Sequence, residues 1–321
     1  MFKIALSALA AVAFLACGPV HAADDEPWKD PSTALVIDAY ELNTIEWDKL
    51  VANKRIAGFI SKASDGLPEV YDCRKPHRGD SMDHCKTMWR KYSVSRELYQ
   101  TRRMLAKAHG LLWGAYHLAR PGNPIDQANH FLDYAEPAAD EMMVLDLESL
   151  DSSEFMSLDD AEIFARHVKA RTGRYPVLYT NHDTAQYIAR RREEYEILSR
   201  LPLWYARYKP EIKGVFPMGN WDNYLLWQFS TASNCDAKSC PMRIDGTRRD
   251  IDVNTVPMTK TALAAVWPQG KLVEERAPEL QHLVVASVSL GTSTLPSKPA
   301  KARATIKRVA TEVTALNYQD F

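Results

Sequence analysis

Eight short apolar runs, spaced along most of the sequence, are the feature that most constrains how this 321-residue chain can fold. They are rich in β-branched and aromatic residues, which favour strands. The runs cover residues 34–39, 57–64, 111–119, 142–149, 176–181, 202–208, 225–230 and 250–254. Helical patterns separate the early runs, and strands that alternate with helices are typical of a parallel sheet. Eight such strands favour a closed barrel over an open doubly wound sheet.

Three of the intervening segments carry signals for the ends of helices. Asn43 and Glu46 have the spacing of a capping box. Further along, Asn123 can cap a helix that has Pro124 at its first position. The segment 157–173 begins with a serine, stacks apolar residues at helical spacing and ends with a glycine. We therefore expect a helix after the first, third and fourth strands.

The helical pattern fades after about residue 190, so the last three strands should follow one another without helices. This predicts an α/β fold, an irregular (β/α) barrel of five β/α units and three further β-strands. We expect the barrel domain to span residues 30–258. Residues 259–321 form a C-terminal extension that we expect to be partly flexible, because its later part is rich in Ser, Thr, Pro and Lys.

The first 22 residues have the organisation of a signal peptide. Lys3 is followed by an apolar run over residues 4–16, and Val20-His21-Ala22 resembles a cleavage site. The run is too short to span a bilayer comfortably, and no later stretch of the sequence is long enough to do so. We expect a periplasmic or secreted protein, with lipoprotein anchoring at Cys17 as the less favoured alternative.

Four cysteines remain after cleavage, and they form two close pairs. In an exported protein the simplest of the three connectivities is Cys73–Cys85 with Cys235–Cys240. The spacings C-x-x-C and H-x-x-x-H, which are typical of metal ligands, do not accompany these cysteines, so disulfides are favoured over a metal site. We also expect no cofactor. With 40 basic and 41 acidic residues the net charge is −1, which gives no indication of nucleic-acid binding.

The run MMVLDLES carries two acids, Asp146 and Glu148, in an otherwise apolar strand. Side chains alternate between the two faces of a strand, so these two carboxyl groups share a face. Their repulsion and partial burial should raise the pKa of one of them and create a proton donor that works near neutral pH. Both acids come late in the strand, at the end of a parallel barrel where active sites lie.

Other candidate strands also end in charged residues. Asp38 ends the first run, Asp250 and Asp252 lie in the last, and Arg120 follows the third. Closure of the barrel would bring these ends around one cleft. Aromatic and imidazole side chains accompany them, namely Tyr116, His117, Tyr179, Trp204, Tyr205 and Trp227. Each of these residues alone is more often a polar strand end or a packing residue, but together they favour a carbohydrate site, because sugars stack on aromatic rings while acids act on the glycosidic oxygen.

With these motifs the chain resembles the glycoside hydrolase family 25 muramidases, the Chalaropsis-type lysozymes, from about residue 35 to 256. The pieces that carry the resemblance are VID (36–38), IEWDKL (45–50), FISKASDG (59–66), GAYHLARPG (114–122), VLDLES (144–149), TGRYPVLYTN (172–181), PLWYARY (202–208), LWQFS (226–230) and DIDVN (250–254). The family's barrel, five β/α units and three strands, agrees with the late loss of helices.

The resemblance implies a role for each acid. Glu148 would hold a proton and give it to the leaving glycosidic oxygen. Asp146 would stay charged and assist the 2-acetamido group, whose carbonyl oxygen attacks the anomeric carbon. Asp38 and Asp252 would support them in the cleft. The residues that would line the sugar subsites are Tyr116, His117, Arg120, Tyr179 and Trp204. The implied partner is the glycan strand of peptidoglycan, cut at the β-1,4 bond between N-acetylmuramic acid and N-acetylglucosamine.

The chain departs from the family pattern at three places. Tyr40 and Glu41 follow VID where many relatives have Ser-His-Trp or a close variant, Asp65 stands where Glu is usual, and the insert 71–92 is longer than is usual. These changes leave open a hydrolase of another acetamido-sugar polymer such as chitin, or an inactive cell-wall-binding protein. A metal-dependent phosphoesterase is disfavoured because the acids have no accompanying pair of histidines. The sequence identifies no inhibitor or immunity protein.

Overall fold

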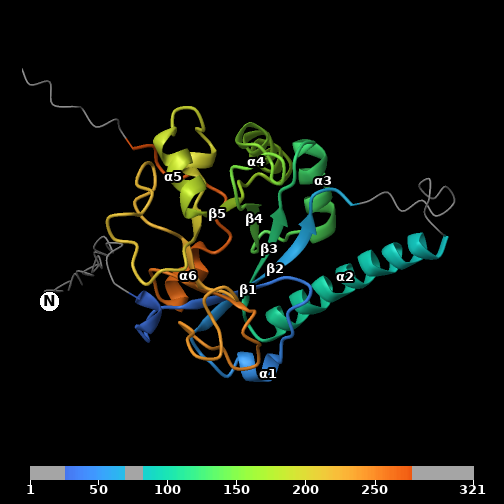
Figure 1. The fold of residues 1–321 in the computed structure, drawn as a ribbon, viewed down its shortest axis with the longest axis vertical. Coiled ribbons are helices and arrows are strands. Elements are labelled where there is room, and N and C mark those ends of the chain that lie inside the picture. The colour runs from blue at the N-terminus through green and yellow to red at the C-terminus, as the bar shows by residue number, and fades with distance from the viewer. Residues whose placement is uncertain (1–25, 69–81, 277–321) are drawn as a thin grey trace, which may run out of the picture. The chain divides into compact units, whose positions relative to one another are not determined.

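The computed structural model describes residues 26–68 and 82–276, which form a closed barrel of eight strands (Figure 1). Strands β1 to β7 run parallel to one another, and β8 is antiparallel to both β7 and β1, which closes the barrel. Their bounds are β1 Leu35–Ala39, β2 Ile56–Asp65, β3 Leu112–Leu118, β4 Met142–Leu147, β5 Val177–Asn181, β6 Leu203–Ala206, β7 Leu226–Ser230 and β8 Asp252–Thr255. The predicted irregular barrel is confirmed.

A helix follows each of the first five strands, and the later strands follow one another without α-helices, as predicted. The helices are α1 Trp47–Leu50, α2 Met82–Ala108, α3 Pro124–Ala135, α4 Leu158–Thr172 and α5 His182–Arg190, with α6 Lys260–Val266 after the last strand. Two short 3-10 helices, Pro27–Lys29 and Leu198–Arg200, precede β1 and β6. The five β/α units and three further strands therefore have the expected order.

The predicted helix ends are partly correct. Ser157 caps α4 by accepting a hydrogen bond from the Asp160 amide at 3.2 Å, and Gly173 ends this helix in the left-handed conformation, with φ of 75°. The capping box at Asn43 is wrong, because α1 is a single turn that begins only at Trp47. The Asn43 side chain instead accepts from the Tyr40 amide and donates to the carbonyl oxygen of Asp250. It therefore ties the loop after β1 to the segment before β8.

The long helix α2 is implied by the predicted five β/α units, but no helix signal in the sequence located it. Its first residues belong to the insert 71–92, and its composition is charged, with only a weak apolar periodicity. The side that meets the barrel buries Tyr99, whose ring packs edge-on against Trp113 at a centroid distance of 5.5 Å. Arg102 from the same side is 4% exposed and donates to two backbone carbonyls in the loop after β1. Tertiary contacts, rather than a regular apolar stripe, hold this helix in place.

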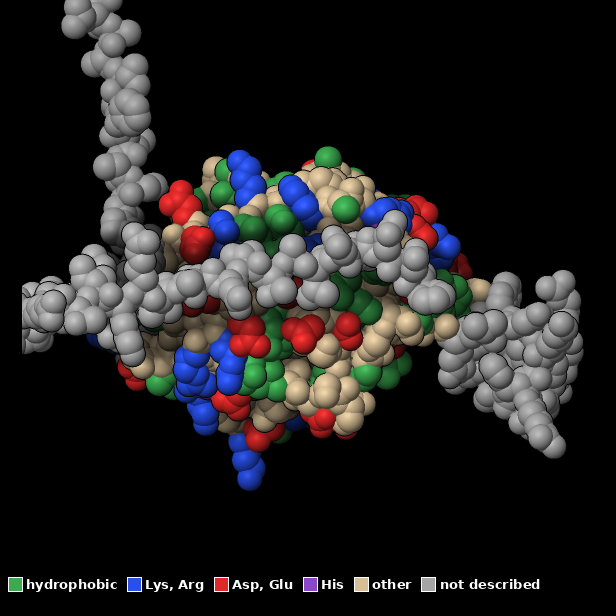
Figure 2. Space-filling view, turned by 90° about the horizontal axis from the view of Figure 1, so that it is seen from above, with side chains coloured by type: hydrophobic (Ala, Val, Ile, Leu, Met, Phe, Trp, Pro, Cys, Tyr) green, Lys and Arg blue, Asp and Glu red, His purple; other side chains and the backbone are tan. Residues whose placement is uncertain are grey.

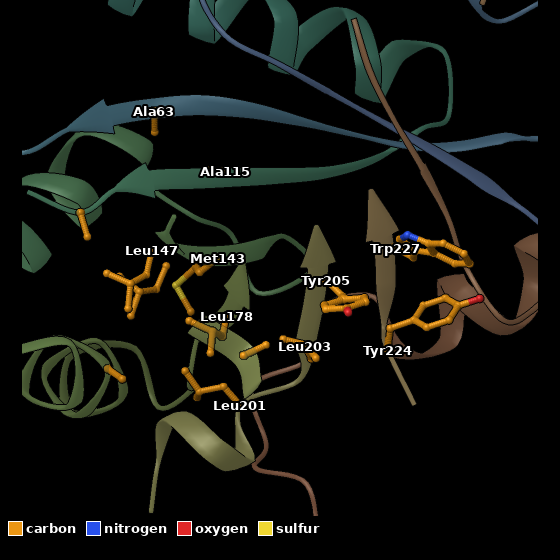
Figure 3. Close-up of a cluster of buried hydrophobic side chains, with 14 of the residues drawn as sticks. Ala63, Ala115, Met143, Leu147, Leu178, Leu201, Leu203, Tyr205, Tyr224 and Trp227 are labelled. Carbon is orange, nitrogen blue, oxygen red and sulfur yellow. The ribbon is translucent and has the colours of Figure 1, made fainter. Parts of the chain in front are cut away.

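Two apolar layers follow from the alternation of side chains along each strand. Inward residues such as Val36, Val144 and Val177 fill the barrel, while their outward neighbours pack beneath the helices and loops. Figure 3 shows part of this outer layer, with Leu147 of β4 and Leu178 of β5 directed away from the barrel interior. The barrel is therefore a packed core, and only its open end is available for a site.

Trp267, just after α6, closes the other end of the barrel interior. It is fully buried, and its indole nitrogen donates to the carbonyl oxygen of Trp113 at 2.7 Å. A Cβ atom at Gly58 would lie 2.9 Å from this ring, so the close approach requires glycine there. The packed part of the chain thus continues past residue 258, where we expected the barrel domain to end.

The predicted disulfide Cys235–Cys240 is present. The predicted partner bond, Cys73–Cys85, lies outside the residues whose side chains are described, as do the expected signal peptide and residues 277–321. Within residues 26–68 and 82–276, no helix is both long enough and apolar enough to cross a membrane.

Candidate active site

The four predicted acids meet where the parallel strands end at their carboxyl termini. Asp38 on β1 is the register partner of Asp252 on β8, and Asp146 on β4 is the register partner of Tyr179 on β5. Glu148 comes one residue after β4 ends. Repulsion from Glu148 contributes to a raised pKa at each of the other three acids, and Asp38 adds to the rise at Asp146 and Asp252, so the carboxyl groups form one electrostatic cluster. Figure 2 views the molecule from above, the direction in which the β2 and β3 arrows of Figure 1 point, and shows several acidic side chains near the middle of that face.

Asp38 is buried and is surrounded by hydrogen-bond donors. Gln228 on β7 donates its amide nitrogen to both carboxyl oxygens, at 3.2 and 3.1 Å, and Asn254 on β8 donates to Oδ2 at 2.7 Å. Burial raises the pKa of Asp38 to about 6, although these donors lower it. Asp38 can therefore carry a negative charge at neutral pH despite its burial.

Asp146 is 5% exposed, and its Oδ1 atom has no hydrogen-bond partner among the described residues. Burial first, and then repulsion from Glu148 and Asp38, raises the pKa of Asp146 well above its usual range. The depth of Asp146 therefore opposes the expectation that it stays charged, because burial penalises the carboxylate form. An unpaired buried oxygen is costly to keep, so this atom is available to a group that enters the cleft.

Glu148 lies at the open side of the cleft, and its side chain is exposed. Desolvation by the surrounding protein raises the pKa of Glu148, and Asp65 adds to the rise, while the cations Arg120 and Lys62 oppose it. The expected rise in the pKa of Glu148 is thus present. Its exposure allows it to reach a bound molecule that the deeper acids cannot reach.

Asp252 is the fourth member of the cluster and is partly buried. Burial, with repulsion from Asp38 as the next cause, raises the pKa of Asp252 to about 8, although a hydrogen bond with Thr231 lowers it. Asp252 therefore holds a proton at neutral pH, beside the carboxylate of Asp38. Within the described part of the chain, no three His, Cys, Asp or Glu side chains form a group that could hold a metal ion.

A set of polar side chains behind Asp38 was missed in the sequence. Gln228 receives hydrogen bonds at Oε1 from the hydroxyl groups of Tyr179, at 2.9 Å, and Tyr208, at 2.7 Å. The indole nitrogen of Trp204 donates to Oδ1 of Asn254 at 2.5 Å. Gln228 and Asn254 occupy inward positions of the motifs LWQFS and DIDVN, so the period of two along each strand could have identified them.

The residues that depart from the family pattern lie at the rim of the cleft. Glu41 forms an ion pair with Lys62 at 2.8 Å, and Lys62 lies 5.8 Å from the centre of the Tyr40 ring. Arg120 makes two hydrogen bonds to Asp65, at 2.6 and 3.1 Å. Both cations near Glu148 are therefore already paired with rim acids, and Arg120 is not free to contact a sugar unless this pair opens.

Three of the predicted sugar-binding residues do not face the open cleft. His117 is fully buried outside the barrel, where Ser64 and Gln127 bind its two ring nitrogens at 2.8 and 3.0 Å. Trp227 is fully buried beside Tyr224 in the outer layer (Figure 3), and its indole nitrogen donates to a backbone carbonyl. Both are outward-facing neighbours of inward-facing residues, and this alternation explains their position. Trp204 faces inward but is only 1% exposed, beneath the Tyr179 ring.

Tyr116 and Tyr179 remain as the predicted aromatic residues that face the acids. Tyr116 lies on β3, and burial first, then the charges of Asp146 and Asp38, raises the pKa of its hydroxyl group. The hydroxyl group of Tyr179 is bound by Gln228. The arrangement can therefore offer an exposed proton donor, a buried acceptor beside it and aromatic walls, which is a set of groups suited to acid-assisted cleavage of a glycosidic bond.

Comparisons with known proteins agree with the fold and with the resemblance in the sequence. The sequence model of "Glycosyl hydrolases family 25" matches residues 92–237. Among solved structures, the bacterial lysozyme from Streptomyces coelicolor is similar, with a TM-score of 0.50 at 21% identity over 74% of this chain and 98% of that one. A family GH25 lysozyme from Aspergillus fumigatus gives a TM-score of 0.50 at 18% identity over 74% and 99% of the two chains. No curated protein matches the sequence.

Proposed function

We propose, from the membership of this chain in glycosyl hydrolases family 25, that this glycoside hydrolase is a lysozyme. Its substrate would be the β-1,4 bond between N-acetylmuramic acid and N-acetylglucosamine in peptidoglycan. The two proteins of similar fold from Streptomyces coelicolor and Aspergillus fumigatus are lysozymes. The observation that carries the proposal is the pairing of an exposed acid with a raised pKa, Glu148, with a buried acid, Asp146, whose Oδ1 atom has no partner among the described residues.

In the proposed reaction Glu148 gives its proton to the glycosidic oxygen as the bond to the anomeric carbon breaks. The carbonyl oxygen of the substrate's 2-acetamido group forms the new bond to that carbon, which gives a cyclic intermediate and retains the configuration after water opens it. Glu148, now a carboxylate, takes a proton from that water. The acetamido N–H would donate to the free Oδ1 atom of Asp146, and this bond favours the charged form of Asp146 as the ring closes.

Export is the second part of the proposal. The sequence of residues 1–22 has the organisation of a signal peptide, and the disulfide Cys235–Cys240 is of a kind that persists in oxidising compartments. We expect the mature chain to begin near Ala23 and to act in the periplasm or outside the cell. N-terminal mass analysis of the processed protein tests this, and a lipid-modified Cys17 would instead indicate an anchored lipoprotein.

Digestion of purified peptidoglycan by the oxidised protein, followed by mass spectrometry of the new ends, tests the activity. New reducing N-acetylmuramic acid ends that are absent with Glu148→Gln would support the proposal, and Asp146→Asn should lose turnover as well. Chitin oligomers, incubated in parallel, test the competing substrate. Cleavage of chitin without cleavage of peptidoglycan would refute the proposed specificity, and cleavage of neither, with binding retained, would indicate a wall-binding protein.

A further inference from the structure

Asn254 has only one orientation that satisfies its surroundings. The indole nitrogen of Trp204 can only donate, so the atom that faces it must be the amide oxygen of Asn254. The carbonyl oxygen of Val36 can only accept, and it lies 3.0 Å from the amide nitrogen on the other side. Because Asn254 is fully buried, a reversed amide would leave these groups unpaired. The nitrogen of Asn254 is therefore directed at Asp38.

Gln228 is oriented in the same sense, but less strictly. Two tyrosine hydroxyl groups, from Tyr179 and Tyr208, converge on its oxygen, and its nitrogen lies between the two oxygens of Asp38. A hydroxyl group can donate or accept, so these tyrosines favour the observed orientation without forcing it. Trp204 thus imposes the stricter constraint of the two.

Both amides therefore present only N–H groups to Asp38, which suits a carboxylate and not a protonated acid. We propose that Trp204, with Tyr179 and Tyr208, acts as a positioning residue that fixes Asn254 and Gln228 as donors and thereby makes Asp38 the acid of the cleft that is charged at neutral pH. This assigns Trp204 a role different from sugar stacking, and it rests on the proposed hydrolase activity for its effect on rate. The charge on Asp38 would leave the protons to be shared among the other three acids.

The other groups around Asp38 do not stabilise its negative charge. The titratable groups that interact with the cluster from the other elements are Glu41 after β1, Lys62 and Asp65 of β2, Tyr116 of β3, Arg120 after β3, Asp146 of β4, Glu148 after β4, Tyr179 of β5, Tyr208 after β6, Asp250 before β8 and Asp252 of β8. The two cations among them, Lys62 and Arg120, are paired with Glu41 and Asp65 at the rim. Among the described groups the amide donors are therefore the main source of stabilisation for a carboxylate at Asp38.

The test compares Trp204→Phe with Trp227→Phe. Each change removes one buried indole N–H and keeps an aromatic ring, but the nitrogen of Trp227 donates to the backbone carbonyl of Arg207 and not to an amide of the site. Titration of the protein labelled with carboxyl-¹³C aspartate, with the Asp38 signal assigned from Asp38→Asn, measures the charge directly. We expect the pKa of Asp38 to rise by about one pH unit in Trp204→Phe, because its Asn254 donor is no longer held, and to stay unchanged in Trp227→Phe.

The pH profile of kcat/KM on peptidoglycan gives the second readout. Its acidic limb should move to higher pH in Trp204→Phe while KM changes little, whereas a higher KM with an unmoved limb would make Trp204 a sugar platform and refute the inference. An unchanged Asp38 titration in a folded Trp204→Phe protein would refute it as well.

If Trp204→Phe does not fold, Tyr208→Phe provides the test. It removes a single hydroxyl group from a residue that is 38% exposed. We expect the pKa of Asp38 to rise less in Tyr208→Phe than in Trp204→Phe, because Tyr179 still binds Gln228. If the pKa of Asp38 changes neither in this variant nor in the double variant Tyr179→Phe with Tyr208→Phe, the inference is overturned. The titration does not depend on turnover. If the wild-type protein cuts no glycan but the variants show these shifts in the pKa of Asp38, the proposed function is refuted and the positioning role of Trp204 stands.

Discussion

Replacement of Asp252 by asparagine should make the protein more stable at pH 8 and leave its stability nearly unchanged at pH 4. Burial and the nearby Asp38 raise the pKa of Asp252 from 3.8 to about 8 in the folded protein. The native state therefore holds this proton more tightly than the unfolded chain does. The free energy of unfolding falls as the pH rises from about 4 to about 8, and it stays low above that range. Asparagine does not ionise, so the variant lacks this fall.

The size of the effect follows from the displacement of the pKa. A difference of about 4 pKa units at 1.36 kcal/mol each gives an upper limit of roughly 5 kcal/mol. Asp252 is partly open to solvent, which screens the repulsion, so we expect about 2 kcal/mol at pH 8. For a domain of this size that corresponds to a rise in Tm of about 6 °C.

Thermal unfolding followed by tryptophan fluorescence at pH 4, 6 and 8 measures the prediction. Asp245→Asn, at an exposed acid on the loop before β8, is the control and should leave the pH dependence unchanged. Parallel curves of Tm against pH for wild type and Asp252→Asn would refute the reasoning. Asp252→Asn should also digest peptidoglycan more slowly, because the acid beside Asp38 is replaced by an amide.

Three further predictions concern the scaffold. Gly58→Ala places a Cβ atom 2.9 Å from the Trp267 ring and should destabilise the protein by about 2 kcal/mol in urea unfolding, an effect that Trp267→Phe should reduce in a double-mutant cycle. Glu162→Ala removes the acceptor of two buried backbone amides near Leu198–Arg200 and should cost about 2 kcal/mol, whereas Glu162→Gln should cost less; equal losses would contradict the role of this oxygen. Reduction of Cys235–Cys240, which closes a short loop, should lower the free energy of unfolding by about 2 kcal/mol and leave the barrel folded, as circular dichroism would show.

The strands were predictable because their apolar patterns reflect burial on two faces, and all eight runs became barrel strands. Helix α2 was not predictable in this way, because its contacts with the barrel involve Tyr99 and the buried cation Arg102 in a mostly charged segment. The cap at Asn43 failed for a related reason. Its side chain bonds to Asp250, 207 residues away, and a local capping pattern contains no information about such a contact.

The acids of the site were predictable from their place at strand ends, whereas the aromatic residues needed one more consideration. Trp227 precedes the inward Gln228, and His117 follows the inward Tyr116, so strict alternation along the strand assigns both to the outer layer. The same alternation assigns Gln228 and Asn254 to the interior. The relative acidities of Asp146 and Glu148 depend on the depth of each group in the folded barrel, which no pattern of residues encodes.

Substitutions of the acids in the cleft should therefore have different effects on stability and on activity, according to how deeply each acid is buried. Asp146 is buried and has a strongly raised pKa, so Asp146→Asn should raise the stability of the protein at neutral pH while it removes turnover. Glu148 is exposed, so Glu148→Gln should remove turnover with little change in Tm. Asp38→Asn should behave differently from both, because its NH2 group would replace one of the two oxygens that accept from Gln228 and Asn254 and would face a donor there. A loss of stability at Asp38 beside a gain at Asp146 would show that the barrel compensates for one buried charge with donors and leaves the other acid for the substrate to pair.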